Sequence, residues 1–244
     1  LHYNSNERES QSMCERIRFI EKNCAFLLRD YGLKYCKKFF ELIDTYLAKE
    51  TSRLKVLILL SQFTSYQTSR VQEIINTSLF GNLLNSILYD LSESIVLVSL
   101  SVLVMIIPQV CDKLSGYLPD LLVIYVRIIT WKHLDSRLPD RLSGLKKFLK
   151  ESSTNWEIAN FDPSYHDEEV SFQTKSKIEF DSSYLATLIY GLFPLNFRKF
   201  HEAPLNYLVE NPPKIVDPSF LIKINNSFSN EGDPYETNLE SIIK

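Results

Sequence analysis

Glycine, cysteine and long apolar runs are all scarce in this chain of 244 residues, and each scarcity excludes a class of protein. The six glycines are isolated, so no glycine-rich loop brings backbone amides against a phosphate group. The four cysteines lack CxxC spacing and stand among apolar neighbours, which indicates reduced core thiols of a cytosolic protein. No GxSxG turn presents a nucleophilic serine. The net charge of −3 favours no polyanionic partner, so nucleic acid binding is not expected.

The longest apolar run lies between Glu93 and Pro108 and contains no charged residue. A membrane-spanning helix needs about 20 apolar residues, and this run is shorter and interrupted by Ser99 and Ser101. A buried strand is the alternative, because apolar residues and serines alternate in the middle of the run, but strands are usually shorter. Ser92 is suited to cap a first helical turn, and Pro108 to end the helix. We therefore expect a helix that is buried on most sides.

Further helical patterns surround this run. Apolar residues have helical spacing in 14–32, 33–49, 52–63, 79–90, 119–131 and 182–193, and Asn196 is suited to cap a helix that begins at Phe197. Helices joined by short turns are typical of HEAT-type repeats, with an irregular helical bundle as the alternative. The predicted fold class is all-α, with HEAT-like stacked antiparallel helix pairs in a single elongated domain.

The same spacing predicts which residues form the core. The first helix should bury one face and end at Gly32; this face consists of Ile17, Ile20, Cys24, Leu27 and Leu28. The second helix should bury Cys36, Phe39, Phe40, Ile43 and Tyr46. From the middle of the chain we expect Leu100, Leu103, Ile124, Ile128 and Trp131 to be buried together, and from its last third Pro194, Phe197 and Phe200.

The helical pattern has two interruptions, which set the expected domain organisation. Residues 1–210 should form a repeat-like core domain, from which 135–181 leave as an irregular surface excursion with a short helical piece near 142–149. Residues 211–244 should form a loop-rich tail that could end in a helix. The chain starts on Leu1 and ends within a helical pattern, so we expect a fragment of a longer protein.

Candidate catalytic or metal-binding residues are few. His133 and Asp135 could form a catalytic dyad, but a solvated helix end with a favourably placed cation is the preferred interpretation. The stretch YHDEEV at 165–170 could bind a hard metal ion, but it lacks a second ligand cluster, so a solvated acidic loop is the simpler interpretation. We expect no catalytic residue, cofactor or metal ion; an unrecognised helical enzyme and a generic protein-interaction module remain the alternatives.

Two groups of lysines concentrate positive charge. Lys34, Lys37 and Lys38 lie on the polar side of the second helix, and Lys146, Lys147 and Lys150 lie on the short helical piece. Such lysines commonly form a solvated face, but they could also contact anionic lipid or an acidic partner. Membrane contact would require both groups to share one side of the molecule.

The stretch YLATLIYGLFPLNFRKF, residues 184–200, resembles the N-terminal region of hamartin, the scaffold subunit of the tuberous sclerosis complex. The resemblance extends over about residues 50–205, through the apolar run and LPDLLVIYVRIITW at 118–131. Its most specific residues are Trp131, Pro194, Asn196, Phe197 and Phe200.

The resemblance implies a helical, HEAT-like scaffold or docking domain without catalytic activity. In this family hamartin pairs with tuberin, whose catalytic domain promotes GTP hydrolysis by the GTPase Rheb and so restrains target-of-rapamycin signalling. The complex is cytoplasmic and associates peripherally with a lysosomal or vacuolar membrane. Hamartin binds tuberin chiefly through a coiled coil further along its chain. Residues 1–244 show no sustained heptads, so they should lack this tuberin-binding coiled coil. This domain could contribute self-association, a docking surface or membrane placement, and the sequence does not choose among these roles.

Overall fold

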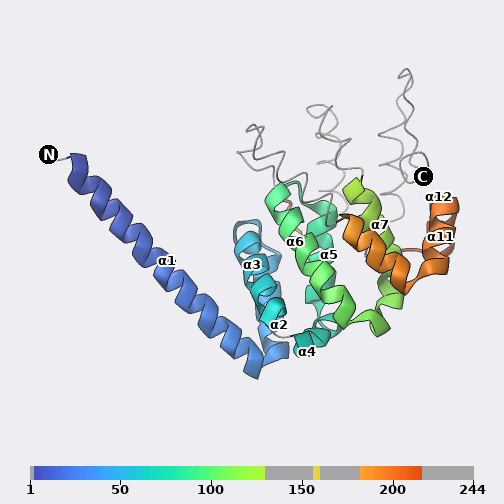
Figure 1. Cartoon of the computed structure of the whole chain (residues 1–244), viewed down its shortest axis with the longest axis horizontal. Coiled ribbons are helices and arrows are strands. Elements are labelled where there is room, and N and C mark those ends of the chain that lie inside the picture. Colours follow the sequence, from blue (N-terminus) through green and yellow to red (C-terminus); the bar gives the residue numbers. More distant parts are fainter. Residues whose placement is uncertain (1–2, 67, 130–155, 160–181, 216–244) are drawn as a thin grey trace, which may run out of the picture.

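The computed structural model describes residues 3–66, 68–129, 156–159 and 182–215, and every regular element in these ranges is helical (Figure 1). The expected all-α class is thereby confirmed. The α-helices are α1 (Tyr3–Lys34), α2 (Cys36–Leu47), α3 (Glu50–Tyr66), α4 (Thr68–Val71), α5 (Ser78–Tyr89), α6 (Glu93–Ile106), α7 (Leu118–Ile129), the helix of residues 182–192, α11 (Pro194–Glu202) and α12 (Pro204–Glu210). Short 3-10 helices occupy Gln72–Asn76, Ile107–Gln109 and Cys111–Tyr117.

The helices form a stack of antiparallel pairs. α2 packs against α3 and α5, and α6 packs against the same two helices. α5 in turn contacts α7, so the stack continues toward the C-terminal helices α11 and α12 at the end opposite α1 (Figure 1). This order, with short turns between paired helices, is the HEAT-like arrangement expected from the sequence.

Helix α6 is enclosed because apolar neighbours cover it on both sides. Ser92 caps it, its side-chain oxygen accepting a hydrogen bond from the Ile95 amide at 3.3 Å. The helix ends at Ile106, and Pro108 lies in the 3-10 turn that follows. Leu100 and Leu103 are fully buried, as are Ile124 and Ile128 of α7, the latter 2% exposed. Within the described ranges, no helix is both long and apolar enough to cross a membrane.

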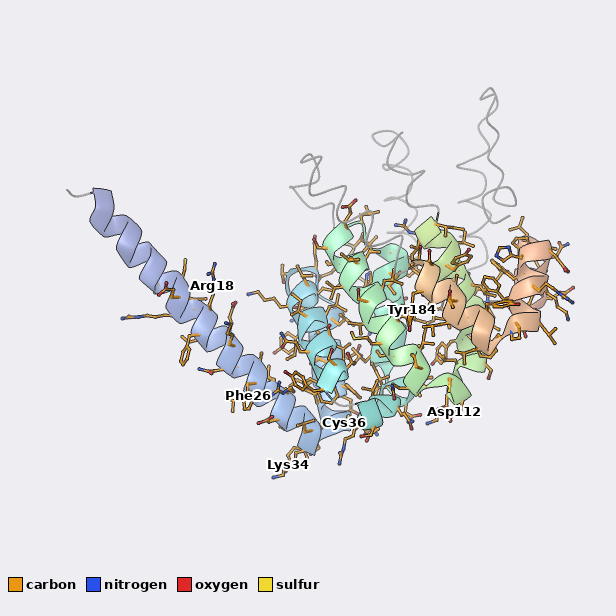
Figure 2. The ribbon with its side chains drawn as sticks, in the orientation of Figure 1. Arg18, Phe26, Lys34, Cys36, Asp112 and Tyr184 are labelled. Carbon is orange, nitrogen blue, oxygen red and sulfur yellow. The ribbon has the colours of Figure 1, made fainter. Side chains whose placement is uncertain are left out.

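Helix α1 differs from expectation in two respects: its apolar face is not buried, and the helix does not end at Gly32. Ile17, Ile20, Cys24 and Leu27 are exposed rather than buried, because most of α1 projects away from the stack (Figure 2). The helix also runs past Gly32 to Lys34. Gly32 is buried, and a Cβ atom there would lie 2.9 Å from the rings of Phe39 and Phe63. This glycine therefore permits the close approach of α1 to the stack instead of ending the helix.

Two more expectations about buried residues are wrong. In α2 the buried face continues to Leu47, which lies one turn beyond Ile43 on the same side of the helix, whereas Tyr46 lies off that side and is 48% exposed. Of the four cysteines only Cys36 is buried; the free thiols of Cys14, Cys24 and Cys111 are exposed.

The C-terminal helices also begin earlier than expected. α11 starts at Pro194, which takes the first helical position with Phe193 as the N-cap residue, so Asn196 caps nothing. The Asn196 amide instead donates a hydrogen bond to the Tyr207 hydroxyl of α12 at 2.9 Å. Pro194 is exposed and Phe197 half-buried, because the start of α11 faces solvent; Phe200, two turns along, is fully buried.

Candidate functional site

A buried arginine joins the first two helix pairs. Arg53, near the start of α3, is fully buried, and its Nε and Nη2 atoms donate to the carbonyl oxygens of Leu47 and Ala48, both at 2.8 Å. These carbonyls end α2 and have no partner within that helix. The third nitrogen, Nη1, lies 2.6 Å from Oδ1 of Asp90 in the turn between α5 and α6. The Arg53 guanidinium group thus satisfies the last carbonyls of α2 and also binds the turn between α5 and α6.

Asp90 is the acceptor at the centre of this joint. Its side chain is completely buried, and Oδ1 also accepts from the Trp156 indole Nε1 at 3.3 Å and from the Ala159 amide at 2.9 Å. Burial raises the pKa of the Asp90 carboxyl to about 6, because desolvation outweighs the opposing effects of Arg53 and the hydrogen bonds. Burial likewise lowers the pKa of Arg127, which lies against the same turn, to about 10.

The segment 156–159 is held against this joint. The Trp156 ring stacks on the Arg53 guanidinium, with 4.0 Å between Cζ and the ring centroid. The Leu91 amide donates to the Ala159 carbonyl at 2.9 Å, and the Glu157 carboxylate accepts from the Glu50 amide at the start of α3. Trp156 and Ala159 are buried and belong to the core, not to a surface excursion, whereas Glu157 between them is exposed.

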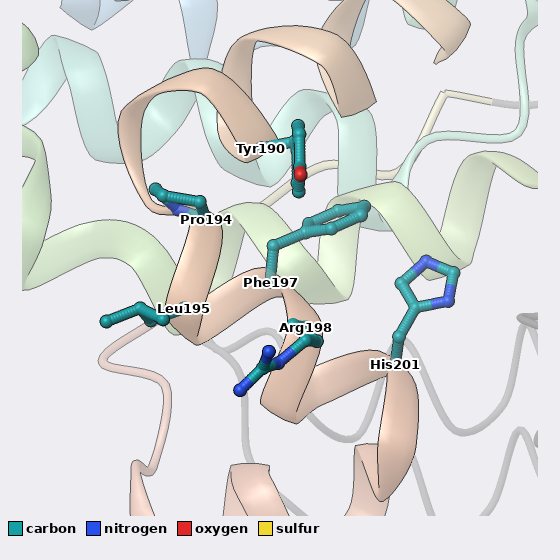
Figure 3. Close-up of a pocket in the computed structure, with 6 residues that line it drawn as sticks. All are labelled: Tyr190, Pro194, Leu195, Phe197, Arg198 and His201. Atoms are coloured by element: carbon teal, nitrogen blue, oxygen red, sulfur yellow. The ribbon is translucent and has the colours of Figure 1, made fainter.

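The region that carried the resemblance forms a shallow pocket of about 400 Å³ (Figure 3). Its lining residues are Tyr190, Pro194, Leu195, Phe197, Arg198 and His201. The Phe197 ring lies between two others, with centroids 5.9 Å from Tyr190 and 4.8 Å from His201. It also contacts Tyr125 of α7 at 5.8 Å, so the pocket wall is anchored to the stack.

The pocket is lined by aromatic, apolar and cationic side chains. None of its lining residues is a carboxylate or a thiol. Partial burial lowers the pKa of His201, which favours the neutral imidazole. Arg198 supplies the positive charge at the rim, and its Nε lies 3.7 Å from the Glu202 carboxylate in an exposed pair. The arrangement suits an apolar or aromatic side chain of a partner, with an acidic group beside it.

One of the two expected lysine groups can be located. Lys34, Lys37 and Lys38 are exposed around the junction of α1 and α2, and Figure 2 shows Lys34 at the tip of this end of the molecule. Lys34 and Lys38 flank the Tyr35 ring at 5.5 and 5.9 Å, and Lys37 lies 3.9 Å from Glu41.

Several sequence candidates lie outside the described residues. They are Lys146, Lys147 and Lys150, the expected helical piece at 142–149, Trp131, His133, Asp135 and the stretch 165–170. Among the residues that the structure describes, no group of three His, Cys, Asp or Glu side chains is arranged to hold a metal ion.

Comparison with known proteins identifies the family. The model of the N-terminal domain of hamartin matches residues 26–148, which is half of the chain. The chain belongs to the hamartin N-terminal domain family. The resemblance inferred from the sequence is thereby confirmed.

Relatives of known sequence and structure agree with this assignment. The tuberous sclerosis 1 protein homolog of Schizosaccharomyces pombe (strain 972 / ATCC 24843) is 25% identical over 197 residues, which cover 74% of this chain and 21% of that protein. A solved structure of the TSC1 N-terminal domain has a TM-score of 0.58 and 25% identity, covering 90% of this chain and 54% of the solved one. A structure of the TSC1 N-terminal and linker domains gives the same TM-score at 24% identity, with 90% and 49% covered, and shares the fold. The hamartin-family chain thus spans about a fifth of the length of its curated relative.

Proposed function

We propose that this hamartin-family domain is a non-catalytic docking module within a scaffold subunit of a multiprotein complex. The observation that carries the proposal is family membership, joined to a stack whose pocket offers aromatic and cationic surface and is lined by neither a carboxylate nor a thiol. A scaffold needs rigid helices and an accessible surface, and both are present. The pocket lining holds a tyrosine, an arginine and a histidine, but no carboxylate or thiol to act with them.

The proposed complex contains tuberin, promotes GTP hydrolysis by Rheb and restrains target-of-rapamycin signalling. Residues 1–244 should bind tuberin weakly, because the grip is expected in a downstream coiled coil. A pull-down with purified tuberin tests this by comparing residues 1–244 with a chain extended through that coiled coil. The extended chain should retain tuberin and the shorter one should not. Nanomolar binding by residues 1–244, which corresponds to a binding free energy of about −12 kcal/mol, would mean that the tuberin-binding site lies in this domain instead.

The pocket is the proposed contact for a further member of the complex. Tyr190→Ala with Phe197→Ala removes two of its three rings, and Val209→Ala, at a residue 76% exposed on α12, is the matched control. In the assembled complex, the double variant should lose subunits or activity while tuberin stays bound through the coiled coil. Equal behaviour of the double variant and the control would remove the pocket from the proposal.

Peripheral placement on a lysosomal or vacuolar membrane is proposed for the exposed lysines. Each lysine near an anionic leaflet contributes about 1 kcal/mol, so Lys34, Lys37 and Lys38 together contribute about 3 kcal/mol. This is below the roughly 4 kcal/mol of millimolar binding, so membrane contact also requires Lys146, Lys147 and Lys150 or a second copy of the domain. Changing all six lysines to glutamate should abolish salt-sensitive sedimentation with phosphoinositide liposomes, whereas Lys55→Glu should not. Equal sedimentation of the six-fold variant would exclude the lysines.

A further inference from the structure

The projecting part of α1 carries apolar side chains that the stack leaves uncovered (Figure 2). Met13, Ile17, Ile20 and Leu27 are between 49% and 66% exposed, Cys24 is exposed, and Tyr31 is 38% exposed. A single exposed apolar residue is ordinary, but these six share one side of α1 and form a stripe, whereas the exposed Phe19 and Phe26 lie on another side. The family match begins at residue 26, so most of this stripe precedes the part of the chain that the family model matches.

The spacing of the stripe is that of a coiled-coil seam. Positions 13, 17, 20, 24, 27 and 31 follow one another at intervals of four, three, four, three and four. This is the heptad pattern, with Ile17, Cys24 and Tyr31 at a positions and Met13, Ile20 and Leu27 at d positions. The pattern covers less than three heptads, which is why it does not stand out as a sustained repeat.

The stripe lies to one side of the face of α1 that packs against the stack. The α1 residues that approach the stack, Leu28 and Gly32, lie roughly a quarter turn around the helix from the stripe at 3.6 residues per turn. At the edge of the stripe α3 contributes Lys55, which pairs with Glu21, so a second helix along the stripe would lie beside α3 and not in its place. A two-fold axis along such a seam would carry the two stacks to opposite sides, so they would not collide.

We propose that α1 pairs with α1 of a second copy of this chain as a short, parallel, two-stranded coiled coil. The charged residues beside the stripe favour a second copy of α1 as the partner helix, and they favour a parallel over an antiparallel orientation. Arg16 occupies a g position and Glu21 the e position five residues later, so a parallel pair places each Arg16 beside the partner's Glu21. An antiparallel pair that aligns the same six layers would instead bring the two Glu21 side chains together. Glu21 also lies 3.0 Å from Lys55, but both side chains are more than half exposed, so this contact holds Glu21 only weakly.

Sedimentation velocity of residues 1–244 over a concentration series tests the pairing. The wild type should show a concentration-dependent dimer. Ile20→Glu should weaken the dimer at least tenfold, because it places two like charges in one d layer. The matched control is Phe19→Glu, which changes the neighbouring residue, itself 67% exposed but on another side of the helix, and should leave the dissociation constant within twofold. Both positions face solvent, so circular dichroism should be unchanged in both variants.

Cysteine cross-linking tests the direction. In a parallel, in-register pair the two Cys24 thiols meet in one a layer, so mild oxidation should give a covalent dimer. Cys24→Ser should abolish this product, and Cys14→Ser, at an e position, should not. A wild type that stays monomeric at about 200 µM, at which weak pairs of micromolar affinity would associate, would overturn the proposal. So would equal disruption by Phe19→Glu, or a covalent dimer that does not depend on Cys24.

Discussion

At the scale of single residues, Arg53 does most to join the helix pairs. Its three nitrogens bond to two carbonyls of α2 and to Asp90, and Trp156 covers its face. The sequence marks an acidic turn at Asp90 but gives no sign of this partner, because Arg53 lies 37 residues earlier within an ordinary helical stretch. A buried ion pair depends on three-dimensional proximity, which helical periodicity does not encode.

Replacing Arg53 should destabilise the domain strongly. Arg53→Ala leaves the Asp90 carboxyl buried without its cation and leaves the Leu47 and Ala48 carbonyls without donors, so we expect a loss of about 3–5 kcal/mol in the free energy of unfolding. Lys55→Ala, two residues along the same helix, removes only an exposed ion pair with Glu21 and should cost less than about 1 kcal/mol. Urea denaturation followed by circular dichroism measures both. Equal effects of the two changes would show that the joint contributes little.

The raised pKa of Asp90 predicts a pH dependence of stability. An unfolded aspartate titrates near 3.8, and Asp90 in the folded protein titrates at about 6. Between these values the folded state binds more protons than the unfolded state, so the contribution of Asp90 to stability falls as pH rises from about 4 to 6 and is constant above that range. Relative to Asp90→Asn, the wild type should therefore gain stability when the pH is lowered from 7 to 5. Denaturation of both proteins at the two pH values isolates this group, and an unchanged difference would contradict the shift.

At the scale of elements, apolar spacing located the helices but not what covers them. For α6 the burial predicted from the apolar spacing matches the structure, because neighbouring helices cover it on both sides. For α1 the prediction and the structure differ, because the spacing of Ile17, Ile20 and Leu27 is compatible either with packing on the stack or with an exposed seam. The position of each helix relative to its neighbours decides between the two, and that position depends on long-range contacts such as the approach of Gly32 to Phe39.

Two helical glycines should respond in opposite directions to substitution by alanine. At Gly32 the added Cβ would lie 2.9 Å from the Phe39 and Phe63 rings, so Gly32→Ala should cost about 1–3 kcal/mol through overpacking. At Gly191 nothing lies within 4 Å of the added Cβ, so Gly191→Ala should stabilise the protein by up to about 1 kcal/mol through helix propensity. Thermal unfolding of the two variants beside the wild type provides the measurement. A stabilising Gly32→Ala would mean that α1 does not approach the stack this closely.

At the scale of the whole molecule, stacked helix pairs make the two ends of the domain unequal. Each pair buries its apolar surface against its neighbours, so the effect of removing an element depends on how much surface it covers. The part of α1 before residue 25 covers little, because its described side chains are exposed. The helices after residue 181 contribute Leu185, Ile189 and Phe200 to the core, and Phe197 packs against Tyr125 of α7.

Deleting residues 1–24 should therefore leave the domain folded, whereas deleting residues 182–244 should not. The measurement is made at about 1 µM, where weak self-association adds little to stability. Under this condition the first deletion should shift the thermal midpoint by less than about 4 °C, which is the effect of roughly 1 kcal/mol in a domain of this size. The second deletion removes the cover of α7 and opens a large apolar face, so we expect aggregation on expression or a much lower midpoint. Circular dichroism melts with parallel light scattering distinguish these outcomes. If the first deletion destabilised the domain as much as the second, the projecting part of α1 would be packed against the stack in solution, and neither its exposed seam nor the pairing built on it would stand.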